Sequence, residues 1–334
     1  MTEHEHEHEH ESIIKHIVIS GGGPSGIVMM GVLQHLEKNG FWNISNIKTI
    51  YATSIGTFIA VLLALKFDWE SIKDYIILRP WHDTYTISAE SFIDSYLKKG
   101  LFGGEVFDTF FKPFFESKDL SLGMTMREFY EYTGIDLHFF TVELNSFECV
   151  DLNYKSFPDL PIIQAVHMSS AIPTIICPVC LDTDKLYVDG GVVNNYPIQP
   201  CLEQYGLSAE KDEILGIYNK YDIEEMCCSN SVNNDSTILE YMVTFLVKLL
   251  KTVCVSEKCV GLIPNEIICI TKPLSLTYMK DTIQSSESRR LLFEYGIETA
   301  THFLEQKRIE FASQVFLSIG QSMVVSDYSE AVVG

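Results

Sequence analysis

Two segments of the sequence place chemically useful groups directly after apolar runs that are typical of buried strands. The first, Gly21–Gly26, reads GGGPSG and fits the spacing G-x-G-x-x-G. Such a loop makes a tight turn and exposes backbone N–H groups at the start of a helix, where an anion is favoured. A dinucleotide site would also need a carboxylate near the end of the next strand, but that strand ends in Thr53-Ser54. The loop therefore predicts an anion-binding turn rather than a dinucleotide site.

The second segment, Ala52–Gly56, reads ATSIG and is close to the G-x-S-x-G turn that joins a strand to a helix. A serine on such a sharp turn projects its hydroxyl above the sheet, and the N–H of the next residue, Ile55, lies near a developing oxyanion. This makes Ser54 a candidate nucleophile. A serine between small residues is also common as a helix cap, so the segment alone leaves both interpretations open.

A carboxylate with a glycine-rich tail lies much later in the chain. Asp189 is followed by Gly190 and Gly191, after a short apolar run, Leu186–Val188, that predicts a strand. Most Asp-Gly-Gly sequences are simple turns. Together with the other two segments, however, Asp189 would stand at the same carboxyl edge of one parallel sheet, where ligands bind in open α/β folds.

The pattern of apolar residues supplies the elements that must hold these groups. Apolar runs at 13–20 and 47–52 predict buried strands, and helical spacing at 27–38 and 56–65 predicts the helices that follow them. This order indicates an α/β fold with a mainly parallel central sheet flanked by helices on both faces.

Later segments extend the pattern. Before the acidic stretch that begins at Asp222, we expect paired strands at 137–144 and 147–152, a helix at 162–170 and a buried strand at 214–218. After that stretch, which is the best linker candidate, we expect a helix at 237–254, a short strand at 266–270 and a long amphipathic helix at 287–307.

The three segments, in this order and with SSAIP at 169–173 before the aspartate, resemble the patatin-like phospholipases over about residues 16–200. The resemblance implies a three-layer sandwich and a lipid acyl hydrolase, with Ser54 as nucleophile and Asp189 as base. It implies an oxyanion hole formed by Gly21, Gly22, Gly23 and Ile55. The supporting motif positions are Gly26, Gly56, Gly190, Gly191, Asn195 and Pro197.

The sequence as a whole predicts four parts, and the resemblance implies a mechanism without histidine. The parts are a tail at 1–12, a patatin-like catalytic domain at 13–222, a linker at 223–236 and a mostly helical extension packed on the core at 237–334. In the mechanism, Asp189 takes the Ser54 proton directly, and water releases the acid from an acyl-enzyme. We expect no cofactor and no metal. The sequence departs from the family pattern at Ala52, where glycine is usual, and in the glycine loop, which has no Lys or Arg.

Several alternatives stay open at this point. A Ser-His-Asp triad would need His167 as its base, although a half-buried helix residue is the simpler interpretation. The chain would also fit a non-catalytic lipid-binding module of the same fold, or an acyltransferase. The segment after Thr237 fits a cap, a dimer surface or a membrane-docking element, and the sequence indicates no oligomeric state.

An aromatic stretch between the elbow and the later strands is a candidate acyl groove or interfacial surface, with core packing as the default interpretation. Its members are Phe92, Tyr96, Leu101, Phe102, Phe107, Phe110, Phe111, Phe114 and Phe115.

The composition restricts the partners. The formal net charge is −21, and −16 without the five Glu of residues 1–11. A field of this sign repels phosphate backbones, which argues against a nucleic-acid partner. It also removes attraction to anionic lipid, so transient contact with a membrane or micelle surface would depend on apolar side chains. We expect weak binding to purely anionic vesicles and better activity on zwitterionic or micellar lipid.

The alternating His and Glu of residues 1–12 are interpreted as an expression tag or disordered tail, with a native metal-binding tract as the alternative. We expect no signal peptide, because Lys15 and His16 interrupt the first apolar run, and no run reaches the roughly 20 residues of a membrane-spanning helix. The nine scattered cysteines, including Cys177 and Cys180, fit reduced thiols. Together these features predict a cytoplasmic protein or one peripheral to membranes.

Overall fold

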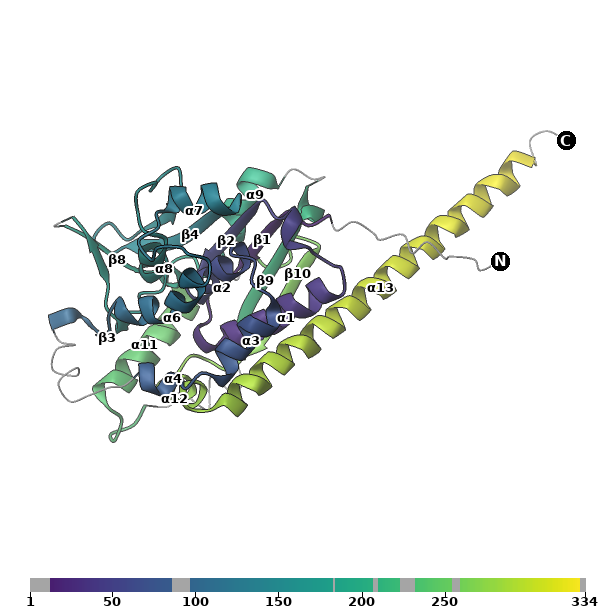
Figure 1. Cartoon of the computed structure of the whole chain (residues 1–334). Coiled ribbons are helices and arrows are strands. Elements are labelled where there is room, and N and C mark those ends of the chain that lie inside the picture. The colour runs from purple at the N-terminus through teal and green to yellow at the C-terminus, as the bar shows by residue number, and fades with distance from the viewer. Residues whose placement is uncertain are drawn as a thin grey trace.

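The computed structural model describes residues 13–85, 97–182, 184–206, 210–222, 232–253 and 259–330. Within them, one mixed sheet carries helices on both faces, and two short strands pair separately (Figure 1). The strands are β1 (His16–Ile19), β2 (Thr49–Thr53), β3 (Gly100–Phe102), β4 (Asp136–Glu143), β5 (Glu148–Leu152), β6 (Thr174–Ile176), β7 (Val179–Leu181), β8 (Lys185–Asp189), β9 (Ile214–Tyr221) and β10 (Asn265–Thr271). The helices are α1 (Gly26–Lys38), α2 (Ile55–Ala64), α3 (Trp69–Leu78), α4 (Trp81–Thr84), α6 (Glu105–Glu116), α7 (Met126–Thr133), α8 (Ile162–Ser169), α9 (Ile198–Tyr205), α11 (Ile238–Val253), α12 (Leu276–Gln284) and α13 (Ser286–Glu330).

The main sheet has the order β10-β9-β1-β2-β4-β8-β7, with β5 also paired to β4. The five strands from β10 to β4 are parallel, and β8, β7 and β5 are antiparallel to their neighbours. Because each parallel strand must return through a crossover, helices cover both faces. The predicted fold class is confirmed. The predicted tail at 1–12, part of the predicted linker, and the aromatic residues Phe92 and Tyr96 lie outside the described residues.

The pairing of β4 brings two distant segments end to end. One edge of β4 pairs with β5 along residues 139–143. The other edge is shared, because β2 pairs in parallel with residues 136–140 and β8 pairs antiparallel with residues 141–143. Thr53, the last residue of β2, lies opposite Phe140, and Asp189, the last residue of β8, lies opposite Thr141. The carboxyl ends of β2 and β8 therefore meet on adjacent positions of one strand.

The alternation of side chains along the strands divides the core between the two faces of the sheet. Ile17, Ala52 and Phe139 belong to the large core that α1, α2 and α13 cover. Val18 and Tyr51 point to the other face, where α9 packs on a smaller cluster. The strong burial of both sets fixes the register of the strands, because a slip of one residue would exchange the faces.

The elements predicted after residue 236 are present as α11, β10 and α13, and α12 lies between the last two. The expected extension is mostly helical, but β10 pairs with β9 over residues 265–271 as an edge strand of the main sheet. Figure 1 shows α13 running beside α1 and then continuing beyond the body of the molecule. Two glycines allow this close contact, because a Cβ on Gly31 would lie 2.2 Å from the carbonyl oxygen of Phe293 and a Cβ on Gly296 would lie 2.1 Å from that of Val28.

We predict that Gly31→Ala lowers the free energy of unfolding by about 1–3 kcal/mol, because the added methyl group forces α1 and α13 apart. Urea unfolding followed by circular dichroism measures the change. The control is Gly123→Ala, because a Cβ there would meet only the Ser121 hydroxyl, at 3.5 Å. Equal stability of the Gly31→Ala and wild-type proteins would contradict the packing of α13 on α1.

Candidate active site

Ser54 stands on the turn between β2 and α2, and its backbone is strained. Its φ of 54° and ψ of −127° lie where residues other than glycine are rare. The N–H and the hydroxyl of Thr57 both donate to the Ser54 carbonyl, at 2.9 and 2.6 Å, and hold the turn in place. Gly56 is required beside it, because a Cβ there would lie 2.7 Å from the carbonyl oxygen of Ile19. Ser54 is the N-cap residue of α2, but its side chain makes no capping hydrogen bond, so the interpretation of its hydroxyl as a helix cap is wrong.

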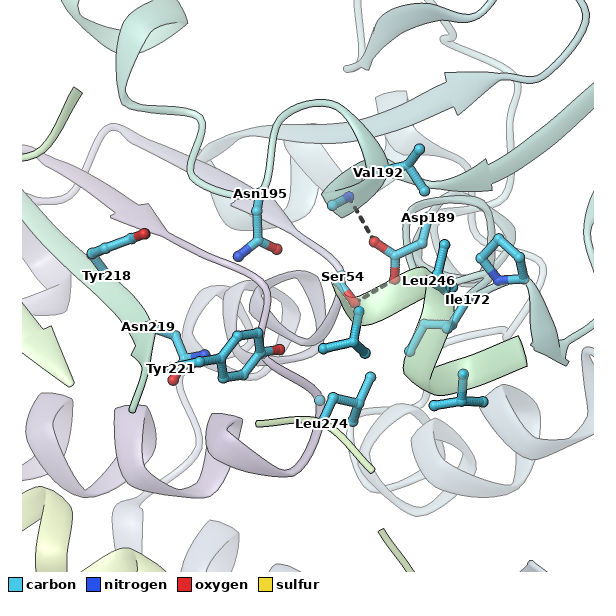
Figure 2. A pocket seen from close by; sticks show the side chains of 16 residues that line it. Ser54, Ile172, Asp189, Val192, Asn195, Tyr218, Asn219, Tyr221, Leu246 and Leu274 are labelled. Carbon is cyan, nitrogen blue, oxygen red and sulfur yellow. Dashed lines mark hydrogen bonds between the residues drawn. The ribbon is translucent and has the colours of Figure 1, made fainter. Parts of the chain in front are cut away.

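The hydroxyl of Ser54 donates to Oδ2 of Asp189 at 2.6 Å (Figure 2). The other carboxylate oxygen, Oδ1, accepts the N–H of Gly191 at 2.7 Å. Both side chains are only 5% exposed, so the pair is nearly desolvated. Gly190 allows the turn after Asp189 to pack closely against β4, because a Cβ on Gly190 would lie 2.1 Å from the carbonyl oxygen of Phe140.

Burial dominates the acid–base behaviour of Asp189. Desolvation raises the pKa of its carboxyl group to about 6, although the hydrogen bonds from Ser54 and Gly191 act in the opposite direction. The carboxylate is thus charged at neutral pH and a stronger base than an exposed aspartate. A group of this kind in contact with a hydroxyl is typical of a catalytic site.

Three of the four expected oxyanion donors are available, two in the glycine loop and one at the turn after β2. The N–H of Gly21 donates to the carbonyl of Asn195 at 2.9 Å, and the Asn195 amide donates back to the carbonyl of Gly21 at 3.3 Å. Gly21 therefore anchors the loop and has no N–H to offer a substrate. For Gly22, Gly23 and Ile55, the described part of the chain contains no such partner.

Two further motif positions, Gly26 and Pro197, lie at the starts of helices. A Cβ on Gly26 would lie 2.4 Å from the Ile55 side chain, so this glycine lets the first turns of α1 and α2 approach. Pro197 precedes α9 and makes no side-chain cap.

Ser169 is a site residue for which the sequence suggested no role. Its hydroxyl accepts the N–H of Ser54 at 3.0 Å and donates to the carbonyl of Phe140 at 2.6 Å. It therefore links the strained turn to β4 and uses the Ser54 N–H, which is not an oxyanion donor here. The sequence signal that could have indicated this residue is the SSAIP segment, in which Ser169 is the first residue and also the last residue of α8.

Two cavities meet at Ser54. The apolar one has a volume of about 210 Å³ and is lined by Ile27, Met30, Phe58, Trp81, Phe102 and Phe110, among others. The other, of about 100 Å³, is called the polar cavity here because it contains Asp189, Asn195, Asn219 and Tyr221. Apolar side chains form much of its wall, and α11 covers it with Val243, Leu246 and Val247 (Figure 2). Of the described part of the aromatic stretch, Phe102 and Phe110 line the apolar cavity, whereas Phe107, Phe111, Phe114 and Phe115 are buried in the core.

His167 does not belong to this constellation. Its Nε2 is 2.8 Å from the carbonyl oxygen of Cys177, and its ring stacks on Phe107. Desolvation lowers the pKa of this imidazole, and the Ser54 hydroxyl is bonded to Asp189 instead. Within the described residues, no cluster of three or more His, Cys, Asp or Glu side chains is arranged to hold a metal ion. In the same part of the chain, Cys177 and Cys180 are free thiols, and no helix combines the length and apolar character needed to cross a membrane.

The family model described as Patatin-like phospholipase matches residues 17–202, more than half of the chain. The chain therefore belongs to the patatin-like phospholipase family. The matched range contains the glycine loop, the elbow at Ser54 and the turn at Asp189.

Two curated relatives and one solved structure are also similar to this chain. The chain is 28% identical over 201 residues to probable lipid hydrolase 463L of invertebrate iridescent virus 6, covering 59% of this chain and 66% of the relative. It is 27% identical over 197 residues to the uncharacterised protein YqhO of Bacillus subtilis, covering 54% and 64%. Each match thus spans just under two thirds of the relative. The crystal structure of VipD from Legionella pneumophila is similar in fold, with a TM-score of 0.52 and 16% identity over 88% of this chain and 67% of VipD.

We predict that Asp189→Asn is more stable than the wild type at pH 8, by up to about 3 kcal/mol, because it removes a desolvated charge. The folded-state pKa of about 6 exceeds the ordinary value of 3.8, so the carboxyl group disfavours folding once it is ionised. The advantage of the variant should shrink between pH 6 and pH 4. Urea unfolding across this range measures it, with the exposed Asp74→Asn as control. An advantage that grows as the pH falls would contradict the sign of the shift.

Proposed function

We propose that the chain hydrolyses carboxylic esters of phospholipids or related acyl lipids through a Ser54–Asp189 dyad and an acyl-enzyme. The observation that carries the proposal is the 2.6 Å hydrogen bond between a strained serine and a buried carboxylate. Family membership supports lipid hydrolysis as the general activity. A lipid-binding module without catalysis would have no need of a backbone strained at Ser54 or of a desolvated charge at Asp189.

In the first half of the reaction, Asp189 takes the proton of the Ser54 hydroxyl as the oxygen attacks the ester carbonyl carbon. The carbonyl oxygen becomes an oxyanion, which the N–H groups of Gly22, Gly23 and Ile55 stabilise; one such donor is typically worth about 3 kcal/mol. The tetrahedral intermediate collapses, the bond to the alcohol breaks, and the alcohol leaves with the proton from Asp189. An ester of Ser54 remains.

In the second half, Asp189 accepts a proton from water, whose oxygen attacks the acyl carbon. The same oxyanion donors act again, and the Ser54 oxygen leaves with the proton from Asp189. The products are a carboxylic acid and the free enzyme. The apolar cavity beside Ile55 is suited to the acyl chain, because Ile, Met, Phe and Trp side chains form most of its walls.

We predict that a fluorophosphonate probe labels the wild type and not Ser54→Ala. Asp189→Asn should be labelled at least about a hundredfold more slowly, because the proton acceptor is lost. His167→Ala is the matched control and should be labelled at a rate near that of the wild type, since its imidazole bonds to the Cys177 carbonyl. If His167→Ala keeps its circular dichroism spectrum but loses labelling, a triad replaces the dyad and the proposal is wrong.

We further propose that the outer face of α11 contacts the lipid surface. Ile238, Tyr241, Met242, Phe245 and Leu249 are exposed and recur at helical spacing, so they form one apolar stripe. The inner face of the same helix covers the polar cavity with Val243 and Val247. A lipid surface that receives the stripe would therefore be separated from the polar cavity by the width of α11. The strongly negative net charge supports a zwitterionic or uncharged surface as the partner.

We predict that Phe245→Ser lowers binding to phosphatidylcholine vesicles by about tenfold, because the phenyl ring no longer enters the apolar layer. Cosedimentation measures the binding, and hydrolysis of a soluble short-chain ester shows that the fold survives. The matched control is Phe147→Ser in the turn between β4 and β5, where the phenylalanine is 52% exposed. Equal losses in both variants, or tighter binding to purely anionic vesicles, would contradict the docking role of α11.

A further inference from the structure

The strand β10 forms one edge of the main sheet, and no other described strand pairs with its outer side (Figure 1). The carbonyl of Thr271 accepts the N–H of Asp222, the residue after β9, so the backbone polar groups of Thr271 face β9. Because these groups point to opposite sides at successive residues of a strand, those of Ile268 and Ile270 face outward. An edge of this kind can accept a further strand.

The same two residues present apolar side chains to the surface. Side chains alternate along β10, so that Ile267 and Cys269 are buried in the core beneath α13. On the opposite face, Ile268 is 39% exposed and Ile270 is 52% exposed. Natural edge strands are usually protected by charged residues, by proline or by a covering element. The middle of β10 carries neither a charge nor a proline, which is typical of a strand that pairs with a partner.

The residues along this exposed face are complementary to their own reversed order. They are Glu266, Ile268, Ile270 and Lys272, so an acid and a base stand at equal distances from Cys269, with two isoleucines between them. The Glu266 carboxylate accepts the hydroxyl of Tyr196 and the N–H of Gly261, and Lys272 is exposed. A second β10 placed antiparallel about Cys269 would bring Glu266 opposite Lys272 and Ile268 opposite Ile270.

The backbone and the side chains select the same register. About Cys269, the residues that lie opposite each other are those whose N–H and C=O groups face outward, as an antiparallel ladder requires. A shift by one residue would place an outward-facing residue opposite one that bonds to β9. A shift by two would place an isoleucine opposite Glu266 or Lys272. The partner that satisfies both conditions is therefore another copy of the same strand.

We propose that two copies of this chain pair through β10, antiparallel about Cys269, and join their main sheets into one continuous sheet. The contact of two seven-residue strands is small, and each copy carries a net charge of −21. The dimer should therefore be weak, with a dissociation constant in the micromolar range. Because β2 and β10 are parallel within each copy, the two Ser54 turns lie at opposite ends of the joined sheet.

Sedimentation velocity of the full chain tests the dimer. At about 0.3 M NaCl, repulsion between exposed charges is largely screened. The wild type should change from one to two chain masses between about 1 and 100 µM. Ile270→Lys should raise the dissociation constant at least about tenfold, because it places a charge opposite Ile268, and circular dichroism verifies its fold. Phe245→Lys on α11 is the matched control, since Phe245 is 55% exposed. A wild type that stays monomeric, or a dimer that Phe245→Lys dissociates and Ile270→Lys does not, would overturn the proposal.

Cysteine pairing tests the register. In an equal mixture of Ile268→Cys and Ile270→Cys proteins, a glutathione redox buffer should form a disulfide between positions 268 and 270, identified by mass spectrometry. The Cα atoms of these positions would lie about 5.5 Å apart, which a disulfide spans. Each variant alone should give at least about fivefold less linkage at the new position, because like positions lie about 7–8 Å apart. Equal linkage in the mixture and in either variant alone would contradict the pairing about Cys269.

Discussion

The shared edge of β4 is the constraint on which the site depends. β2 and β8 approach it from opposite directions and stop at adjacent positions, opposite Phe140 and Thr141. Ser54 follows β2 directly, and Asp189 is the last residue of β8. The strand pairing therefore holds these two residues close together. Backbone pairing, which is cooperative and mostly buried, therefore sets a side-chain contact between groups 135 positions apart in the sequence.

The same constraint makes the site costly for the fold. It holds Ser54 at a positive φ and leaves the Asp189 carboxylate with a raised pKa of about 6. Both costs are compensated locally. Ser169 and Thr57 take up the N–H and the carbonyl of Ser54, and the N–H of Gly191 faces the carboxylate. Stability is thus given up at the position where the proposed reaction needs an activated oxygen and a base, as is common at catalytic sites.

The sequence was sufficient for features that local chemistry determines. The glycine loop, the elbow and the turn at Asp189 each have a residue pattern that few backbones accept, and strand–helix alternation predicted the parallel sheet. The sequence was insufficient where a single hydrogen bond determines which of several similar backbone N–H groups stays available. Nothing local distinguishes the N–H of Gly21, which Asn195 uses, from that of Gly22. Asn219 lies in a run that reads simply as a buried strand, and the hydrogen bond that its side chain accepts comes from Thr271, 52 positions away.

The two cavities show how α11, which comes late in the chain, contributes to the site around Ser54, which comes early in it. The apolar cavity is built by segments close to the elbow and the aromatic stretch, whereas the polar cavity is closed by α11 and by Leu274. The inner and outer faces of α11 belong to one rigid element, so any force on its exposed stripe acts on the wall formed by Val243 and Val247. In the proposed function, a lipid surface in contact with the stripe would therefore act on the wall of the polar cavity beside Ser54, whereas the apolar cavity has walls that do not involve this helix.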